Sequence, residues 1–79
     1  MLISAASRRA GAPEGPWLVD AFCKAGGATR GYQNAGFRVI GVDIDLQPNY
    51  CGDEFVQADA LDYFQRLPAK VVAVAASPP

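Results

Sequence analysis

Asp20-Ala-Phe-Cys-Lys-Ala-Gly-Gly-Ala-Thr-Arg-Gly31 is the segment from which the fold of this chain can be predicted. The apolar run Trp17-Leu-Val19 leads into it and is typical of a buried strand. Gly26 and Gly27 then allow a tight turn and a close approach of the backbone to a ligand. After them, small or apolar residues recur at helical spacing at Ala28, Gly31, Tyr32 and Ala35. A strand, a glycine turn and a helix in this order present free backbone N–H groups, and so they predict a ligand site.

An acidic residue closes the next apolar run, Phe37-Arg-Val-Ile-Gly-Val-Asp43. In nucleotide-binding sheets, an acidic side chain at the end of the second strand binds the ribose hydroxyls. A glycine-rich turn taken alone is as often a structural turn as a ligand cradle. The spacing from the glycines to Asp43 favours the ligand interpretation.

The rest of the chain alternates between strand and helix patterns. Strands are predicted at 17–22, 38–43, 54–57 and 71–76, and helices at 28–35 and from about 59 to 67. Gly36 is placed to end the first helix in a left-handed conformation, and Asp59 to cap the second. The segment 45–52, limited by Pro48 and Gly52, is predicted to be a short, broken helical turn. The pattern predicts an α/β fold with a parallel sheet of about four strands, right-handed crossovers and flanking helices.

Two segments are predicted within the 79 residues. Residues 1–16 are small, polar or proline-containing, which favours a flexible tail, and residues 17–79 form one domain. A domain of this size buries only roughly 60% of its unfolded surface. The strand at 71–76 is the most apolar and is predicted near a sheet edge, so we expect poor stability in isolation.

Composition excludes several classes of function. The formal net charge is −1 and the seven Lys and Arg residues are scattered, so no nucleic-acid-binding patch is indicated within the chain itself. The chain has no histidine, and its two cysteines, Cys23 and Cys51, are far apart, so we expect no metal site and a reducing cytoplasmic location. No apolar run is long enough for a signal peptide or a membrane span.

The motifs resemble those of the DNA (cytosine-5) methyltransferases. The first family motif, Asp-x-Phe-x-Gly-x-Gly-Gly-x-x-x-Gly, is matched by residues 20–31, and the family's next segment resembles Ala35-Gly-Phe-Arg-Val-Ile-Gly-Val-Asp-Ile-Asp45. A third motif is similar to Gln57-Ala-Asp-Ala60, and the fourth, a Pro-Cys pair after a buried strand, is matched only as far as Ala76-Ser-Pro-Pro79. The resemblance covers 17–79 and implies a partial Rossmann-like fold of the S-adenosylmethionine-dependent methyltransferases.

The resemblance also implies a cofactor, S-adenosylmethionine, and residues that bind it. Phe22 would contact the cofactor, and the backbone of the glycine turn would meet its methionine part. Asp43 would accept hydrogen bonds from the ribose, Ile44 would lie against the adenine, and Asp59 would accept from the adenine amino group. The cofactor-binding residues implied in this way are Asp20, Phe22, Ala25, Gly26, Gly27, Asp43, Ile44, Asp59, Ala60 and Pro79.

The chain departs from the family pattern at two places. The nucleophilic cysteine, which attacks a flipped cytosine, would lie beyond Pro79, so no catalytic residue is assigned and the chain is expected to be inactive alone. DNA would be bound through the rest of the enzyme, or the chain would pair with a complementing chain. Lys24 stands where the family usually has glycine. If that position needs a positive φ, lysine costs on the order of 1 kcal/mol, and its charge would weaken binding of a cationic cofactor.

Three alternatives remain open. Ser77-Pro-Pro79 also suits an amino-group DNA methyltransferase, whose catalytic motif is Pro-Pro followed by an aromatic residue. A nicotinamide-dependent dehydrogenase is less favoured because Gly-x-Gly-x-x-Gly is absent at that spacing. The chain can also be a non-catalytic remnant that binds S-adenosylmethionine. Related cytosine-5 enzymes that act on RNA share the early motifs, so the parent substrate is open as well.

Overall fold

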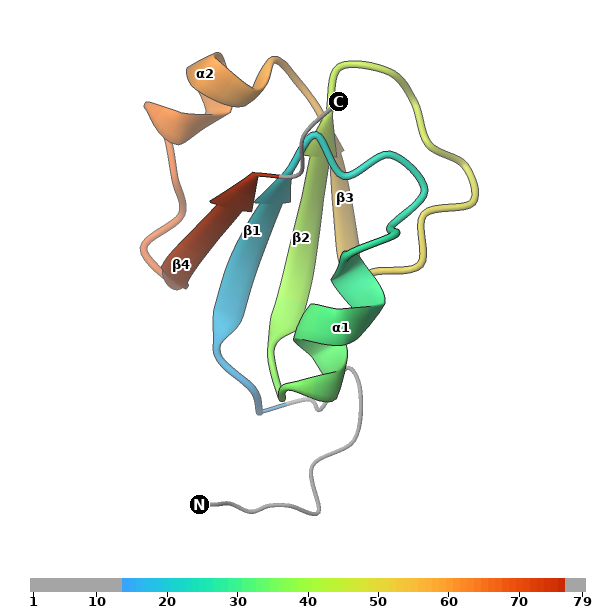
Figure 1. Cartoon of the computed structure of the whole chain (residues 1–79). Coiled ribbons are helices and arrows are strands. Elements are labelled where there is room, and N and C mark those ends of the chain that lie inside the picture. Colours follow the sequence, from blue (N-terminus) through green and yellow to red (C-terminus); the bar gives the residue numbers. More distant parts are fainter. Residues whose placement is uncertain (1–13, 77–79) are drawn as a thin grey trace.

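Four parallel strands form a single sheet in the computed structural model, which describes residues 14–76. They are β1 (Trp17–Ala21), β2 (Arg38–Asp43), β3 (Glu54–Gln57) and β4 (Val71–Ala76), in the spatial order β3-β2-β1-β4. Two short helices, α1 (Thr29–Asn34) and α2 (Ala60–Phe64), flank the sheet (Figure 1). The predicted α/β class, parallel sheet and flanking helices are confirmed. The order equals the first four strands of a doubly wound 3-2-1-4-5-6 sheet and is compatible with a partial Rossmann-like fold.

Element boundaries agree with the sequence pattern most closely in the strands. The second, third and fourth strands begin and end where predicted, whereas β1 ends one residue earlier because Phe22 adopts a φ of 58°. Both helices are shorter than predicted. At the end of α2, the N–H of Arg66 bonds to the carbonyl of Tyr63, three residues back, which tightens and closes the last turn.

The segment between β2 and β3 was predicted to be a short, broken helical turn, and the structure has a single turn there without a helix. It is an extended loop with one turn, in which the N–H of Tyr50 donates to the carbonyl of Gln47 at 3.0 Å. Pro48 and Gly52 prevent a helix from propagating there. The loop is nevertheless held against the sheet, because the ring of Tyr50 packs next to Gly41 of β2.

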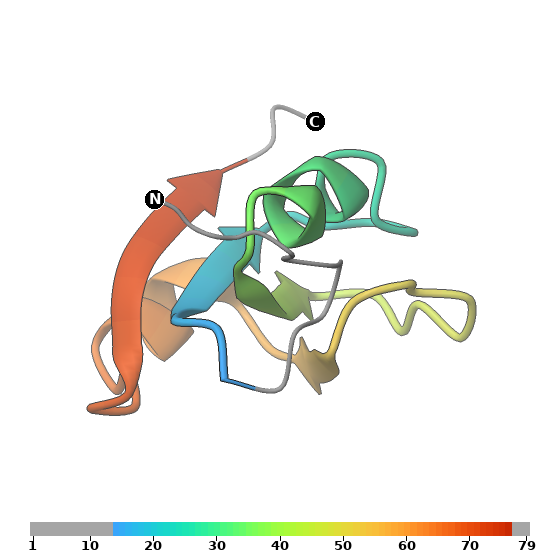
Figure 2. The ribbon, with the colours of Figure 1, turned by 90° about the horizontal axis from the view of Figure 1, so that it is seen from below.

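The two helices lie on opposite faces of the sheet (Figure 2). The α2 face carries an apolar core built from alternate strand residues and the inner side of the helix: Val19, Ala21, Ile40, Val42, Ala60 and Tyr63. Trp17 is partly buried and packs against this core. The guanidinium of Arg38 and the ammonium of Lys70 lie 4.5 and 4.1 Å from its ring centroid.

The α1 face is built differently. Asp20, Gly41 and Phe55 are aligned across β1, β2 and β3, so their side-chain positions share this face. Thr29 and Gln33 are the buried residues of α1 above it. Leu18 and Val39 are also aligned and buried on this face, next to Asp20 and Gly41. The α1 face therefore combines aliphatic residues with a carboxylate, a glycine and an aromatic ring.

The strand β4 lies at the edge of the sheet formed by the described residues, as predicted. Val72 is 67% exposed, and Val74 is also exposed. An edge strand with exposed valines and no charged residue lacks the usual protection against pairing with another chain. This feature supports the expectation of low stability in isolation.

Candidate functional site

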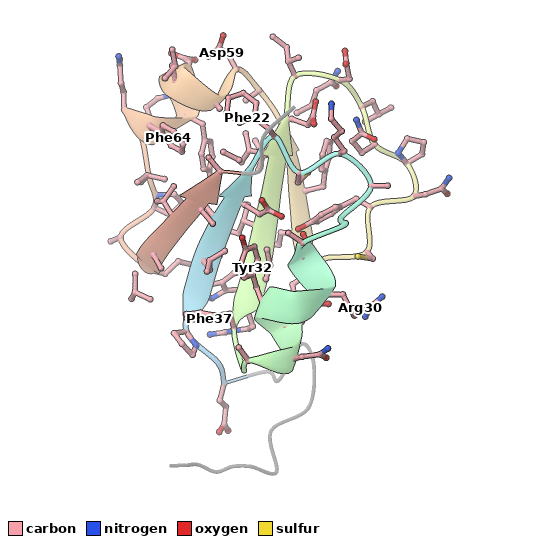
Figure 3. All side chains as sticks on the ribbon, in the orientation of Figure 1. Phe22, Arg30, Tyr32, Phe37, Asp59 and Phe64 are labelled. Carbon is pink, nitrogen blue, oxygen red and sulfur yellow. The ribbon has the colours of Figure 1, made fainter. Side chains whose placement is uncertain are left out.

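A pocket of about 280 Å³ lies where β1, β2 and β3 end. Its lining comes from three separate strand ends: Phe22, Asp43, Ile44, Asp59, Ala60 and Leu61. In open parallel sheets, ligands bind beyond the carboxyl ends of the strands. Figure 3 shows Phe22 and Asp59 together at this end of the sheet.

Three of the lining side chains are large, apolar and exposed: Phe22 (43%), Ile44 (63%) and Leu61 (69%). Apolar side chains gathered in a concave site, with a few polar groups among them, are typical of small-molecule pockets. Leu61 was not predicted as a site residue. The sequence offered one indication for Leu61, because it follows Asp59 by two residues. The first turn of α2, which Asp59 caps, places both side chains at the pocket.

Asp43 ends β2 with its carboxylate at the pocket, and the residue is only 7% exposed. Its Oδ1 accepts a hydrogen bond from the N–H of Asp45, and its Oδ2 accepts one from the N–H of Lys24, each at 3.0 Å. The N–H of Asp45 first, and then that of Lys24, hold the pKa of this carboxyl below its usual range, although burial opposes them. Asp43 is therefore ionised at neutral pH, and each oxygen can still accept from a ligand hydroxyl.

Asp59 caps α2, as predicted. Its Oδ1 accepts hydrogen bonds from the N–H groups of Leu61 and Asp62, at 2.9 and 3.3 Å. Within residues 14–76 no group donates to Oδ2. The cap thus fixes the carboxylate through one oxygen and leaves the other to accept from a ligand, so the capping and binding roles are compatible.

The glycine turn lies beside the pocket rather than in its lining. Gly26 has a φ of 104°, and a Cβ added there would lie 2.5 Å from Sγ of Cys51, so both conformation and space require glycine. Gly27 and Ala25 are exposed, and nothing would lie within 4 Å of a Cβ at Gly27. The turn therefore offers open backbone next to the pocket.

Asp20, which was also predicted from the resemblance, lies outside the pocket. Asp20 is fully buried, and its Oδ2 accepts a hydrogen bond from Oγ1 of Thr29 at 2.8 Å. The structure thus places Asp20 beneath the turn, where it ties β1 to α1. Pro79 lies outside the described residues.

Two non-glycine residues of the turn adopt left-handed backbone conformations, Phe22 with a φ of 58° and Lys24 with a φ of 51°. Such a conformation costs roughly 1–2 kcal/mol per residue. For Lys24 a positive φ was a conditional prediction, because the family usually has glycine at that position. Nothing in the sequence indicated a positive φ at Phe22. Strain of this kind persists only where neighbouring groups hold it, and it is concentrated at functional sites. Here Phe22 lines the pocket, and the N–H of Lys24 is held by Asp43.

Asp53 is exposed and lies in a bend just before β3, and its carboxylate also has partners within the fold. Its Oδ2 accepts from Nε2 of Gln33 at 2.9 Å and from the N–H of Val39 at 2.8 Å. The carboxylate therefore joins the end of the loop to α1 and β2. Sequence gave no signal for these partners, because they lie 14 and 20 residues away along the chain.

Neither cysteine is placed as a nucleophile. Cys23 is buried, and burial together with the negative charges of Asp20 and Asp43 raises the pKa of its thiol to about 12. The thiol of Cys51 faces the carbonyl of Gly26 at 3.5 Å. A reactive cysteine needs a thiolate near neutral pH, which the surroundings of Cys23 disfavour.

Comparison of the chain with protein-family models, with curated proteins and with solved structures found no match. Among residues 14–76 no group of three or more His, Cys, Asp and Glu side chains could hold a metal ion. In the same part of the chain no helix is long and apolar enough to cross a membrane.

Proposed function

We propose that this chain binds S-adenosylmethionine and forms the cofactor-binding part of a DNA (cytosine-5) methyltransferase. The observation that carries the proposal is the pocket at the strand ends. Five of its six lining residues are ones that the family resemblance implies: Phe22, Asp43, Ile44, Asp59 and Ala60. These residues come from three separate segments of the chain.

The chemistry of the pocket suits an adenine nucleoside. The phenyl ring of Phe22 and the side chain of Ile44 offer apolar surface for a purine, and the carboxylates of Asp43 and Asp59 offer acceptors for ribose hydroxyls and an amino group. A volume of about 280 Å³ lies just below the range of ligand sites, roughly 300–1,000 Å³, and is too small for the whole cofactor. We therefore assign the nucleoside half of the cofactor to the pocket, and its methionine half to the open backbone at Gly27.

The cofactor, when bound, supplies an electrophilic methyl group on a cationic sulfur. The described residues would bind and orient it, and neither Cys23 nor Cys51 is assigned as the nucleophile. DNA binding and the nucleophile would therefore come from another segment or a complementing chain. The assignment to DNA and to cytosine rests on the motif resemblance.

The first test is calorimetric titration of the chain with S-adenosylhomocysteine and, separately, with NAD⁺. We expect binding of the former and much weaker binding of the latter. Asp43→Asn and Asp59→Asn each remove a charged acceptor, so each should weaken S-adenosylhomocysteine binding by roughly 10- to 100-fold. Asparagine still caps a helix, so Asp59→Asn separates the binding role from the capping role.

A matched control is Asp62→Asn on the same helix. Among the described residues, the carboxylate of Asp62 pairs only with the exposed Arg66, at 3.0 Å, and such a surface pair contributes little. Its removal should leave the affinity unchanged. An undetectable affinity of the natural sequence, or equal losses in all three variants, would reject the proposed function.

The methyl-transfer step is tested with a labelled methyl donor and DNA. We expect no transfer by the chain alone. Labelling of cytosine C5 would contradict the absence of a nucleophile, and labelling of an exocyclic amino group would instead support an amino-group methyltransferase.

A further inference from the structure

Tyr50 lies in the β2–β3 loop, and its ring occupies space that three glycines leave free. A Cβ on Gly41 or on Gly52 would overlap the ring itself, and a Cβ on Gly26 would lie 3.4 Å from two of its carbons. The ring also packs against Phe55 of β3, with centroids 5.8 Å apart. The loop is thus fixed to β2 and to the glycine turn by one side chain.

The hydroxyl of Tyr50 continues a buried chain of hydrogen bonds. Oγ1 of Thr29 lies 3.0 Å from the Tyr50 hydroxyl and donates to Oδ2 of Asp20 at 2.8 Å. Because threonine has a single hydroxyl proton, which goes to Asp20, Tyr50 must be the donor to Thr29. Burial raises the pKa of Tyr50, so the phenol keeps this proton at neutral pH.

This chain reaches the two sides of the glycine turn. Asp20 precedes the turn on β1, Thr29 follows it at the start of α1, and the ring of Tyr50 contacts the position of Gly26 in the middle. Next to Tyr50, the thiol of Cys51 faces the carbonyl of Gly26. These contacts therefore hold both ends and the centre of the turn, whereas the backbone at Gly27 stays open.

We infer that Tyr50 is a positioning residue for the cofactor site: its ring and its bond to Thr29 hold the glycine turn in the conformation that presents Phe22 and Lys24. The inference rests on the proposed function. It adds a residue that no part of the motif resemblance assigns and that does not line the pocket. Its physical basis is the strained backbone at Phe22 and Lys24, which is retained only where surrounding groups hold it.

The test compares Tyr50→Phe with Tyr32→Phe. The first removes the hydroxyl that bonds Thr29, and the second removes a hydroxyl from a half-buried tyrosine of α1 with no hydrogen-bond partner among the described residues. Affinity for S-adenosylhomocysteine is measured where circular dichroism shows each variant fully folded. We expect about fivefold weaker binding for Tyr50→Phe, the effect of one neutral hydrogen bond, and no change for Tyr32→Phe.

Thr29→Ser and Thr29→Val extend the test. Serine keeps the hydroxyl and should retain the affinity, whereas valine keeps the shape and should lose at least as much as Tyr50→Phe. In the double variant, Tyr50→Phe should add little to Thr29→Val, because both remove the same bond. Additive losses would overturn the proposed connection through Thr29.

A second measurement does not depend on the ligand. Amide hydrogen exchange is followed in the ligand-free chain at Lys24, whose N–H bonds to Asp43, and at Gly26, whose N–H bonds to the carbonyl of Cys23 at 2.9 Å. Tyr50→Phe should speed exchange at both by about fivefold and leave Val19 and Ile40 unchanged, and Tyr32→Phe should change none of them.

The two measurements distinguish a failure of the proposed function from a failure of the inference about Tyr50. If the natural sequence does not bind S-adenosylhomocysteine, the proposed function fails, and exchange alone decides whether Tyr50 holds the turn. If it binds, the inference requires both effects. Equal affinity, or equal exchange, in Tyr50→Phe and Tyr32→Phe overturns it.

Discussion

On the α2 face of the sheet, Val19, Ile40 and Val42 pack into an apolar core, whereas on the α1 face the corresponding region holds Asp20 and Gly41. The first face is closed by nonspecific burial of aliphatic surface, which depends on volume and tolerates variation in detail. The second buries Leu18 and Val39 as well, but it adds directional contacts around Tyr50. Because the glycine turn belongs to the second face, we infer that the apolar core supplies most of the stability and that the α1 face sets the geometry of the turn beside the pocket.

The largest expected effect comes from breaking the apolar face. Ile40 is 1% exposed, and Ile40→Ala should reduce the free energy of unfolding by about 2–5 kcal/mol, from lost burial and the cavity left behind. The affinity of the folded fraction for S-adenosylhomocysteine should stay the same. Urea denaturation measures the first quantity, and calorimetry below the unfolding transition measures the second.

Leu46→Ala is the control for that substitution. Leu46 is 63% exposed in the β2–β3 loop, so its truncation should change stability by less than about 0.5 kcal/mol. A comparable loss at Leu46 would mean that the loop, and not the α2 face, limits stability.

Substitutions on the α1 face should lower stability less and weaken ligand binding more. Gly41→Ala places a methyl group against the ring of Tyr50 and 2.7 Å from Sγ of Cys23. Overpacking of this kind costs typically about 1–3 kcal/mol, and relief by movement of Tyr50 should also weaken ligand binding. Thermal unfolding and titration of the same samples give both numbers.

Gly31→Ala supplies a control of opposite sign. Gly31 lies in α1 with nothing within 4 Å of an added Cβ, so alanine should raise stability by about 0.5–1 kcal/mol and leave the affinity unchanged. If Gly41→Ala lowered stability but bound the ligand as tightly as the natural sequence, the α1 face would not set the geometry of the site.

Alkaline pH should also act on the α1 face. The pKa of Cys23 is raised to about 12 in the folded chain, so the unfolded chain loses this proton first as the pH rises. Below about pH 8.5, the ordinary pKa of a cysteine thiol, the thiol is protonated in both the folded and the unfolded chain and its contribution to stability is fully present. Between there and pH 12 the free energy of unfolding falls by at most about 1.4 kcal/mol per pH unit. Urea denaturation at pH 8, 9 and 10 measures the slope.

Cys23→Ala removes the thiol and should flatten this alkaline slope. A control is Cys51→Ala, which leaves Cys23 in place and should keep the slope. If both variants kept it, another group would be responsible; the buried phenol of Tyr50, whose pKa is also raised, is the next candidate.

The difference between the two faces also explains what the sequence could predict. The strands β2 and β4 follow from apolar runs, and the short β3 from Phe55-Val56, all close to Gly, Pro or Asp residues, so their positions were predicted. The cap at Asp59 and the position of Asp43 follow from local chemistry in the same way. Tyr50 and Asp53 were missed because their roles depend on partners far along the chain, such as Thr29, 21 residues away. A weak signal existed: glycine inside an aliphatic strand, as at Gly41, indicates a close neighbour but not which one.

The smallest expected effect, and the sharpest test of the turn, is at Lys24. Lys24→Gly removes the cost of a left-handed lysine, but it makes the unfolded chain more flexible, so the net gain in stability should be at most about 1 kcal/mol. Lys24→Ala keeps the unfavourable φ and should give no gain. Thermal unfolding of the two variants isolates the backbone contribution.

Affinity for S-adenosylmethionine separates backbone from charge at the same position. Asp43 already holds the N–H of Lys24 in place, so the turn conformation should persist in both variants. We therefore expect the lysine charge to be what weakens binding of a cationic cofactor, and both variants to bind it about twofold more tightly by removing one exposed charge. The neutral S-adenosylhomocysteine sulfur should show no such gain. Tighter binding in Lys24→Gly alone would show instead that the backbone conformation limits the affinity. Equal affinities in all three chains would show that Lys24 does not affect cofactor binding.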